Sequence, residues 1–245
     1  MTAPRKVAPE HTLYVSRFAS WAPGLAGKDQ WLEWAAGNRQ ISLSGEGPGL
    51  DFPEPRWQGM TPGEVKMFKR RLSQVSKMAV QVVHELLPVR EDTGMVFLSF
   101  RGEIARQYKI NRMLIEEGDI SPAAFSLSVF NTPAAAASIA FNLTAGYSAI
   151  YPAGNRFAHG FLAGAAPVLC GDREEILLVY ADERCPPEYG GLCPLNHEPL
   201  AFGIILAYRQ EDASIPVPLI PETLPALESP REFLKYLYCY GRAAS

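Results

Sequence analysis

The chain has 245 residues and a formal net charge of -3, and 47% of its residues are hydrophobic while 20% are charged. These values are typical of a globular protein with one large domain or two small ones, and they give no support to nucleic-acid binding, which a basic surface would favour. No apolar run is long enough to cross a bilayer, and no apolar segment follows the basic N-terminus, so we expect a cytoplasmic protein.

The first sixty residues predict one strand, one short helix and a long loop. Residues 13–18 are typical of a strand, and the Pro-Gly pair within residues 21–24 indicates a turn. Residues 28–36 predict an amphipathic helix that ends at Gly37. The stretch 37–60 is rich in glycine, proline and serine, and it predicts an irregular loop.

Residues 61–87 predict one long helix. Thr61 is a suitable N-cap, Pro62 suits the first helical position, and Glu64 can complete a capping box with Thr61. The basic residues of this helix lie mostly opposite its apolar stripe, and they are Lys66, Lys69, Arg70, Arg71 and Lys77.

Strands and helices alternate through the rest of the chain. The expected strands are 95–100, 146–151, 176–180 and 200–208, and the expected helices are 103–117, 132–143, 156–169 and 231–240. Residues 212–230 contain five prolines and predict an extended connector. This alternation favours an α/β fold with a largely parallel central sheet, in which the alanine-rich helix is buried, packed tightly between two sheets.

The four cysteines, at positions 170, 185, 193 and 239, form no Cys-x-x-Cys pair. We expect reduced thiols, and we expect Cys170, at the end of a helix, to be buried and structural. Cys185, Cys193 and His197 could be read as a zinc site, but their spacing is loose and a fourth ligand is missing from the pattern. We therefore expect no metal and no cofactor.

Residues 146–160 have the form of a nucleophile elbow, in which a strand and a tight turn lead into a helix of small residues. Together with its surroundings, this segment resembles the N-terminal half of β-ketoacyl synthases, which have the thiolase fold. The motifs that carry the resemblance are Ser121-Pro122, Phe125, Ser128, Val129-Phe130-Asn131, the alanine-rich helix, Gly146-x-Ser148, the elbow and Gly171-Asp172.

The chain is also similar to short β-ketoacyl synthase-like N-terminal domain proteins, which are chain-length factors associated with aryl polyene biosynthesis. Further shared motifs are Trp21-Ala-Pro-Gly24, Arg70-Arg71-Leu72-Ser73, the segment 125–129 and the proline-rich C-terminal region. The resemblance covers roughly residues 13–208, and it implies a single thiolase-like domain over residues 1–245.

Two departures from the synthase pattern concern catalysis. Asn155 stands where the resemblance places the nucleophilic cysteine, and the C-terminal half, with two histidines and a lysine, is not present; the histidines at 11, 84, 159 and 197 do not match those positions. Claisen condensation needs a thiolate and groups that stabilise the oxyanion. The resemblance therefore implies a non-catalytic subunit that pairs with a full-length ketosynthase and supports elongation on an acyl carrier protein.

The resemblance also assigns roles to three surfaces. The strand before the elbow would pair with the partner, and Pro152 would end that pairing; the residues are Tyr147, Ser148, Ala149, Ile150, Tyr151 and Pro152. Bulky side chains at the dimer axis would limit the acyl tunnel of the partner; the residues are Phe125, Val129, Phe130, Asn131 and Thr132. The carrier protein would contact Lys66, Lys69, Arg70 and Arg71.

Each assignment has an alternative. The tyrosines of the strand, and Phe125 and Phe130, could simply fill the core, and the basic residues could form a solvated helix face. Asn155 could hydrogen-bond within the elbow or hold a left-handed turn, which asparagine tolerates. For the whole protein, the alternatives are a stand-alone malonyl-carrier decarboxylase, another acyl-processing enzyme, and a homodimeric scaffold or binding protein.

Overall fold

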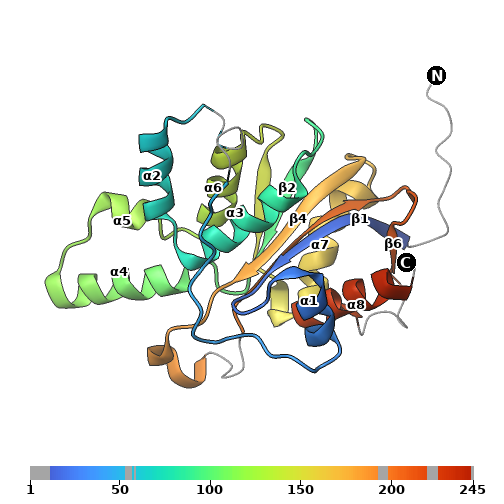
Figure 1. The fold of residues 1–245 in the computed structure, drawn as a ribbon. Coiled ribbons are helices and arrows are strands. Elements are labelled where there is room, and N and C mark those ends of the chain that lie inside the picture. The colour runs from blue at the N-terminus through green and yellow to red at the C-terminus, as the bar shows by residue number, and fades with distance from the viewer. Residues whose placement is uncertain (1–11, 53–56, 58, 193–197, 220–225, 244–245) are drawn as a thin grey trace.

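A six-stranded sheet forms the centre of the fold, in the strand order β3-β2-β4-β5-β1-β6 (Figure 1). The computed structural model describes residues 12–52, 57, 59–192, 198–219 and 226–243. The strands are β1 (Thr12–Trp21), β2 (Gly94–Leu98), β3 (Tyr147–Ile150), β4 (Glu175–Asp182), β5 (Leu200–Ala207) and β6 (Ile215–Pro218).

Four of the six strands run in one direction. β3, β2 and β4 are parallel neighbours, β5 is antiparallel to both β4 and β1, and β6 is antiparallel to β1. The predicted α/β fold with a mostly parallel sheet is confirmed in this sense, although the three pairings beyond β4 are antiparallel. The segment of β6 was expected to belong to an extended connector, because Pro216 and Pro218 lower its strand propensity. It nevertheless pairs with β1 at the edge of the sheet.

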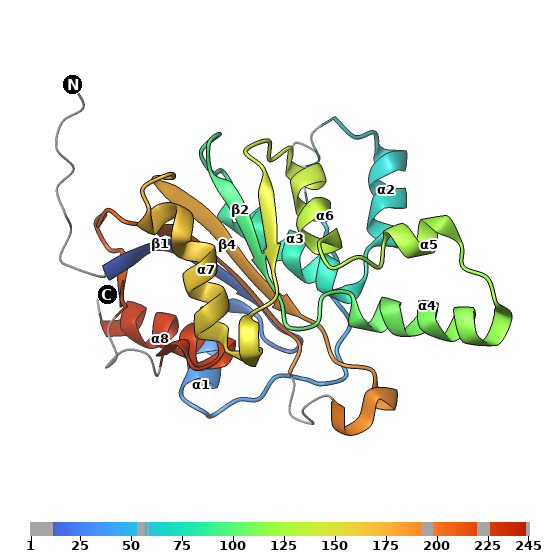
Figure 2. The same ribbon diagram turned by 180° about the vertical axis from the view of Figure 1, so that it is seen from behind.

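Helices cover both faces of the sheet (Figure 2). One face packs against α3 (Gln74–Leu86) and α6 (Thr132–Phe141), and the other against α7 (Phe157–Leu169), α1 and α8. α1 spans Gly27–Ala35 and α8 spans Pro230–Ala243, and these two helices contact each other. The short 3-10 turns are η2 (Ala153–Asn155) and η3 (Pro187–Leu192).

Small residues bring two helices close to the sheet. In α6 the buried side chains include Ala134, Ala136, Ala137 and Ala140, so the predicted buried alanine-rich helix is confirmed, but it packs on one sheet rather than between two. In α7, a Cβ atom added at Gly164 would lie 3.0 Å from Val96 Cγ1. A larger residue there would push the helix away from β2.

The prediction of one long helix over residues 61–87 is wrong, because the structure has two helices there. α2 (Pro62–Arg71) begins with the predicted capping box between Thr61 and Glu64. Leu72 is extended, with φ of -72° and ψ of 134°, and Ser73 then caps α3 by accepting from the Ser76 backbone N–H. The apolar stripe continues across the break, so periodicity alone did not reveal it.

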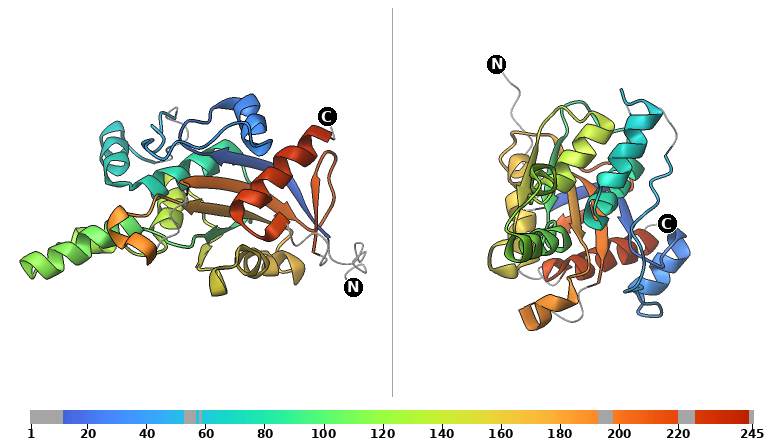
Figure 3. Two further views of the ribbon diagram at one scale, coloured as in Figure 1. Left: turned by 90° about the horizontal axis from the view of Figure 1, so that it is seen from below. Right: turned by 90° about the vertical axis from the view of Figure 1, so that its left-hand side faces the viewer.

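A helical arm projects from the body of the protein (Figure 3, left). We define the arm as α4 (Ile104–Glu117), which was predicted, and α5 (Pro122–Ser126), which was expected to be loop. Gly118 ends α4 in the left-handed conformation, and Ser121 caps α5 by accepting from the Ala124 backbone N–H. The arm begins one residue after the buried side chain of Glu103.

Two predictions about cysteines are wrong. Cys185 is disulfide-bonded rather than reduced. Cys170, the C-cap residue of α7, is exposed rather than buried. Cys193 and His197, the other two residues of the considered zinc site, lie outside the described residues. Within the described part of the chain, no helix is both long and apolar enough to cross a membrane.

Candidate functional site

β3 lies at one end of the sheet and pairs with β2 on one side. Within the described ranges, no strand pairs with its other edge. Tyr147 is 39% exposed and Tyr151 is 54% exposed, so the alternative in which these tyrosines fill the core is wrong. Ser148 is exposed as well, whereas Ala149 and Ile150 are half-buried. The segment predicted to pair with a partner, residues 147–152, therefore contains a strand, β3, whose outer edge is open among the described residues.

The elbow follows this strand directly (Figure 2). β3 ends at Ile150, Pro152 is buried, and the turn of η2 leads into α7. Asn155 has φ of 55°, which confirms the predicted left-handed turn. Its Oδ1 accepts a hydrogen bond of 2.6 Å from the Tyr151 hydroxyl, as expected for a residue that bonds within the elbow.

The elbow has the strand-turn-helix shape of an acyl-transfer site, but its side chains do not supply a nucleophile. Asn155 is exposed and carries an amide, which does not form a thioester. His159 lies one turn further on, and its Nδ1 is 3.0 Å from the Ala153 carbonyl oxygen. Cys170 is at the opposite end of α7, about 20 Å away by the rise of a helix.

The predicted tunnel residues fall into an exposed group and a buried group. Phe125 is 58% exposed and Val129 is 39% exposed, so neither belongs to the core. Phe130 is half-buried, with its ring 6.2 Å from that of Phe97, and Thr132 is buried. Asn131 is exposed, and its Nδ2 donates to the Tyr147 hydroxyl at 3.3 Å. This contact connects the segment after the arm to β3.

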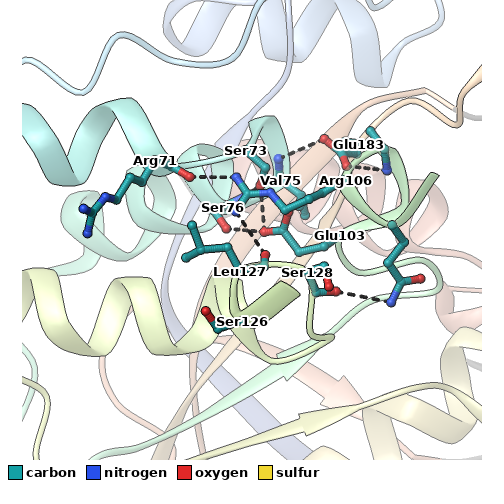
Figure 4. Close-up of polar contacts among 12 residues, drawn as sticks. Arg71, Ser73, Val75, Ser76, Glu103, Arg106, Ser126, Leu127, Ser128 and Glu183 are labelled. Carbon is teal, nitrogen blue, oxygen red and sulfur yellow. Dashed lines mark hydrogen bonds and ion pairs between the residues drawn. The ribbon is translucent and has the colours of Figure 1, made fainter. Parts of the chain in front are cut away.

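Arg106 fastens the base of the arm to the body (Figure 4). Its Nη1 donates to the Leu127 carbonyl oxygen at 3.1 Å, and its Nη2 donates to that of Arg71 at 2.7 Å. Its Nε lies 3.5 Å from Glu103 Oε2. One guanidinium thus connects the end of α2, the start of α4 and the end of α5. The sequence analysis missed this role, because the three segments are separated along the chain.

Two buried carboxyl groups lie beside Arg106 (Figure 4). Glu103 accepts hydrogen bonds from the hydroxyl groups of Ser73 at 2.7 Å and Ser76 at 2.6 Å. Glu183 accepts from the backbone N–H groups of Val75 at 3.4 Å and Ala105 at 3.2 Å. Both carboxyls therefore join the start of α3 to the base of the arm, where helix N-termini favour acceptors.

The environment of these carboxyls favours their protonated forms. Burial, and then the nearby Glu103 carboxylate, raise the pKa of Glu183 to about 7. Burial also raises the pKa of Glu103, against the hydrogen bonds from Ser76 and Ser73 and the charge of Arg106. The Glu183 carboxyl consequently gains or loses its proton near neutral pH.

The predicted carrier-protein contacts lie on α2. Lys66, Arg70 and Arg71 are exposed, whereas Lys69 is half-buried, with its Nζ 5.4 Å from the centre of the Trp57 ring and 3.7 Å from Asp51 Oδ1. A cavity of about 270 Å³ opens beside them, and it is lined by Phe52, Trp57, Met60, Pro62, Val65, Lys66 and Lys69. The sequence analysis identified the charges but not the aromatic cavity.

A family model described as "Beta-ketoacyl synthase, N-terminal domain" matches residues 31–223, which is well over half of the chain. The chain belongs to this family. The match extends from α1 across the elbow to β5 and β6, so the whole site described above lies within the β-ketoacyl synthase N-terminal domain. No curated protein matches the sequence.

Solved structures confirm the thiolase-like fold of this ketosynthase family member. A chain of "Ketosynthase (ApeO) in Complex with its Chain Length Factor (ApeC) from Xenorhabdus doucetiae" is 23% identical, with a TM-score of 0.68, 91% of this chain covered and 92% of that chain. "The ishigamide ketosynthase/chain length factor" is 14% identical, with a TM-score of 0.55 and coverages of 85% and 64%.

A third similar structure contains a carrier protein by its description, "type II PKS acyl-carrier protein in complex with its ketosynthase bound to the hexaketide". It is 13% identical, with a TM-score of 0.56, 82% of this chain covered and 64% of that chain. This chain thus spans under two thirds of the length of the ishigamide and carrier-protein-bound ketosynthase chains, but nearly all of the chain in the ApeO–ApeC structure.

Proposed function

We propose that this protein is the chain-length-factor-like subunit of a heterodimeric ketosynthase, and that it pairs through β3 with a full-length ketosynthase that carries the nucleophilic cysteine. The observation that carries the proposal is the open edge of β3, which leads directly into an elbow occupied by Asn155. In this assignment the chain contributes surface and shape, and its partner contributes the condensation chemistry.

The chemistry of the β3 edge suits strand pairing with another protein. An open edge presents unpaired N–H and C=O groups, which a partner strand satisfies by extending the sheet. Tyr147 and Tyr151 flank the edge and are exposed, and tyrosine is enriched in the buried centres of interfaces. No residue from 146 to 155 carries a charge, so pairing would bury no unpaired ion there.

The comparisons support the same assignment. The matched chain in the ApeO–ApeC structure is close to this chain in length, because each covers more than nine tenths of the other. Its description names a ketosynthase together with a chain-length factor. A chain of this size is therefore compatible with a role beside a ketosynthase in polyketide biosynthesis of the aryl polyene type.

The exposed part of the predicted tunnel surface is placed to act on such a partner. Phe125 and Val129 present apolar side chains that their own core does not use, and the neighbouring Asn131 contacts Tyr147 of the proposed pairing strand. A partner that pairs with β3 would meet these side chains near the same interface. We assign Phe125 and Val129 the role of limiting the acyl tunnel by steric exclusion, and Lys66, Arg70 and Arg71 that of attracting an acidic carrier protein.

The first test is a tagged pull-down from the native host, followed by native mass spectrometry of the purified complex. We expect a one-to-one complex with a longer ketosynthase chain. A stable homodimer, or a monomer with no synthase attached, would contradict the proposal. Release of carbon dioxide from a malonyl carrier protein by the isolated chain would contradict its non-catalytic part and favour a decarboxylase.

The tunnel assignment needs a separate test in the reconstituted complex. Phe125→Ala and Val129→Ala should shift the products toward longer acyl chains, because each removes bulk from the proposed tunnel end. Leu162→Ala is the matched control, since Leu162 is 37% exposed but lies on α7. Chromatography and mass spectrometry of the released acyl chains give the product lengths, and an unchanged distribution in both tunnel variants would contradict this role.

A further inference from the structure

The opposite edge of the sheet also contains an open stretch of strand. β6 pairs with β1 only over Thr12–Val15, although β1 continues to Trp21. The register of β1 against β5 shifts between Val15 and Arg17, which places an irregularity at Ser16 where β6 departs. Within the part of the chain that the structure describes, no strand pairs with the outer edge of residues 16–21.

The backbone groups on this edge can be assigned from the pairing. Pro216 lies opposite Tyr14 and has no N–H, so the β1 residues that bond β6 are Leu13 and Val15. Peptide groups alternate between the two edges of a strand, and the shift at Ser16 displaces this alternation by one residue. Beyond it, the N–H and C=O groups of Phe18 and Ser20 face outward.

A cleft of about 720 Å³ runs along this open edge. One wall is aromatic, because the Trp31 ring of α1 stacks on Tyr238 of α8 at 5.5 Å, and Tyr238 also meets Phe18 edge-on at 5.0 Å. The Tyr238 hydroxyl lies 2.6 Å from the Ser20 hydroxyl, which fixes this wall against β1. The other side of the cleft contains Trp21 and Glu85, and Glu85 comes from the opposite face of the sheet.

We propose that this edge is a docking site for an extended peptide segment of a partner protein, which adds to the sheet beside residues 16–21 of β1. The open edge is about 20 Å long, which matches a strand of five or six residues. The outward peptide groups of Phe18 and Ser20 are paired by the backbone of an extended chain, and a compact apolar ligand would leave them unpaired.

The two walls define the sequence that such a segment needs. Side chains of an added strand alternate between the faces of the sheet, so every second side chain would meet the Trp31 and Tyr238 wall and the others would meet Trp21 and Glu85. The site therefore fits aromatic or branched apolar residues that alternate with basic residues. Lys28 also lines the cleft, at the start of α1, and would disfavour a basic residue at that position.

The test uses a capped hexapeptide of alternating lysine with tyrosine or valine, titrated into the full chain. Two further peptides carry N-methyl groups on the odd or on the even backbone nitrogens, so that each blocks one edge of the added strand. Tryptophan fluorescence gives the affinity, and amide hydrogen exchange gives the protection of Phe18 and Ser20. We expect binding by the parent peptide, at least tenfold weaker binding by one methylated peptide only, and at least tenfold slower exchange at both amides.

Variants of the full chain add a test of the charge assignment. Glu85→Lys should weaken the parent peptide at least fivefold and strengthen a peptide in which glutamate replaces lysine. Glu91→Lys is the matched control, since Glu91 is exposed and lies outside the lining of the cleft, and it should change neither affinity.

Three results would overturn the proposal. The first is no binding of the parent peptide to the full chain. The second is equal binding of both methylated peptides, or full displacement by indole with no protection of the amides, because either would make the cleft a pocket for small aromatic molecules. The third is binding only after removal of residues 1–11, because the occupant would then belong to this chain. None of these results depends on whether the protein pairs with a ketosynthase.

Discussion

The two edges of the sheet expose backbone in different ways. The β3 edge is short and uncharged, and it leads into the elbow and toward the exposed residues Phe125 and Val129. The β1 edge is half covered by a strand with two prolines and interrupted at Ser16, and only its second half opens into a cleft. An open, uncharged edge suits a whole sheet of a partner, whereas a walled edge admits a single strand. The surroundings of an edge therefore decide which partner can use it.

The largest effect should come from a charge on the β3 edge. Tyr147→Glu removes an exposed aromatic side chain and places a carboxylate where pairing would desolvate it, so we expect the affinity for the ketosynthase to fall more than 100-fold, or about 3 kcal/mol. Surface plasmon resonance with the purified partner measures this change. Gln40→Glu adds the same charge to an exposed loop residue and should leave the affinity unchanged. Retained binding by Tyr147→Glu would contradict pairing through the β3 edge.

The next effect concerns the buried carboxyl pair at the base of the arm, on the β3 side of the molecule. Because the pKa of Glu183 is raised to about 7 in the folded protein, the folded state holds a proton that the unfolded state releases near pH 4.5. The resulting stabilisation is complete below pH 4.5 and is lost as the pH rises through about 7. We therefore expect the free energy of unfolding to fall between pH 5 and pH 8 by roughly 3 kcal/mol at most.

Urea unfolding across this pH range measures the slope, and Glu183→Gln should reduce it. Glu85 on the β1 side offers a comparison, because burial raises its pKa as well, but the residue is exposed whereas Glu183 is buried. Glu85→Gln should therefore reduce the slope less than Glu183→Gln does. A slope that neither substitution changes would assign the pH dependence to other groups.

A smaller effect should follow from loosening the arm. Arg106→Gln removes both carbonyl contacts and the cation beside Glu103, so we expect the free energy of unfolding to fall by about 2 kcal/mol. The loss stays this small because Glu103 can take up a proton when the cation is removed. Hydrogen exchange of residues 121–131 should speed up more than exchange in β1. On the same helix, Arg112→Gln breaks an exposed ion pair with Glu116 and should lower the stability much less than Arg106→Gln does. Equal losses in the two variants would argue against a clamp at Arg106.

The smallest effect should be that of Asn155→Ala. The substitution removes the contact with Tyr151 and places alanine at a positive φ, which costs about 1 kcal/mol. Affinity for the ketosynthase and product formation by the complex should not change, because the proposed function gives the elbow residue no part in the chemistry. Asn155→Gly is the control, since glycine tolerates this φ and should recover part of the stability. Loss of product formation in both variants would contradict a non-catalytic elbow.

The sequence predicted the elements that depend on local pattern. The elbow, the alanine-rich helix and the capping box of α2 all follow from residues within one or two turns of each other, and all are present. The break at Leu72 was missed because the apolar stripe continues through it, and β6 was missed because of its prolines. The exposure of Tyr147 could not be predicted from its neighbours in the sequence, because it follows from the place of β3 at the end of the strand order in the sheet.

The base of the arm was beyond sequence analysis for a similar reason. Glu183 bonds the backbone of Val75 and Ala105, which are 108 and 78 residues away along the chain. Such contacts leave no periodic or spaced motif, because the acceptor is a single carboxylate and the donors are ordinary backbone groups. The only signal was an acidic pair, Asp182-Glu183, at the end of an apolar strand, where burial of charge requires partners.

The seating of α7 has a consequence for mapping the proposed interface by mutagenesis. A Cβ atom added at Gly160 would lie 2.7 Å from Pro152 Cγ, so a methyl group there has to displace the residue that ends the pairing segment. A substitution at Gly160 or Gly164 should therefore reduce assembly without touching a partner. An alanine scan restricted to exposed side chains would overlook both glycines, although they set the position of the surface that it probes.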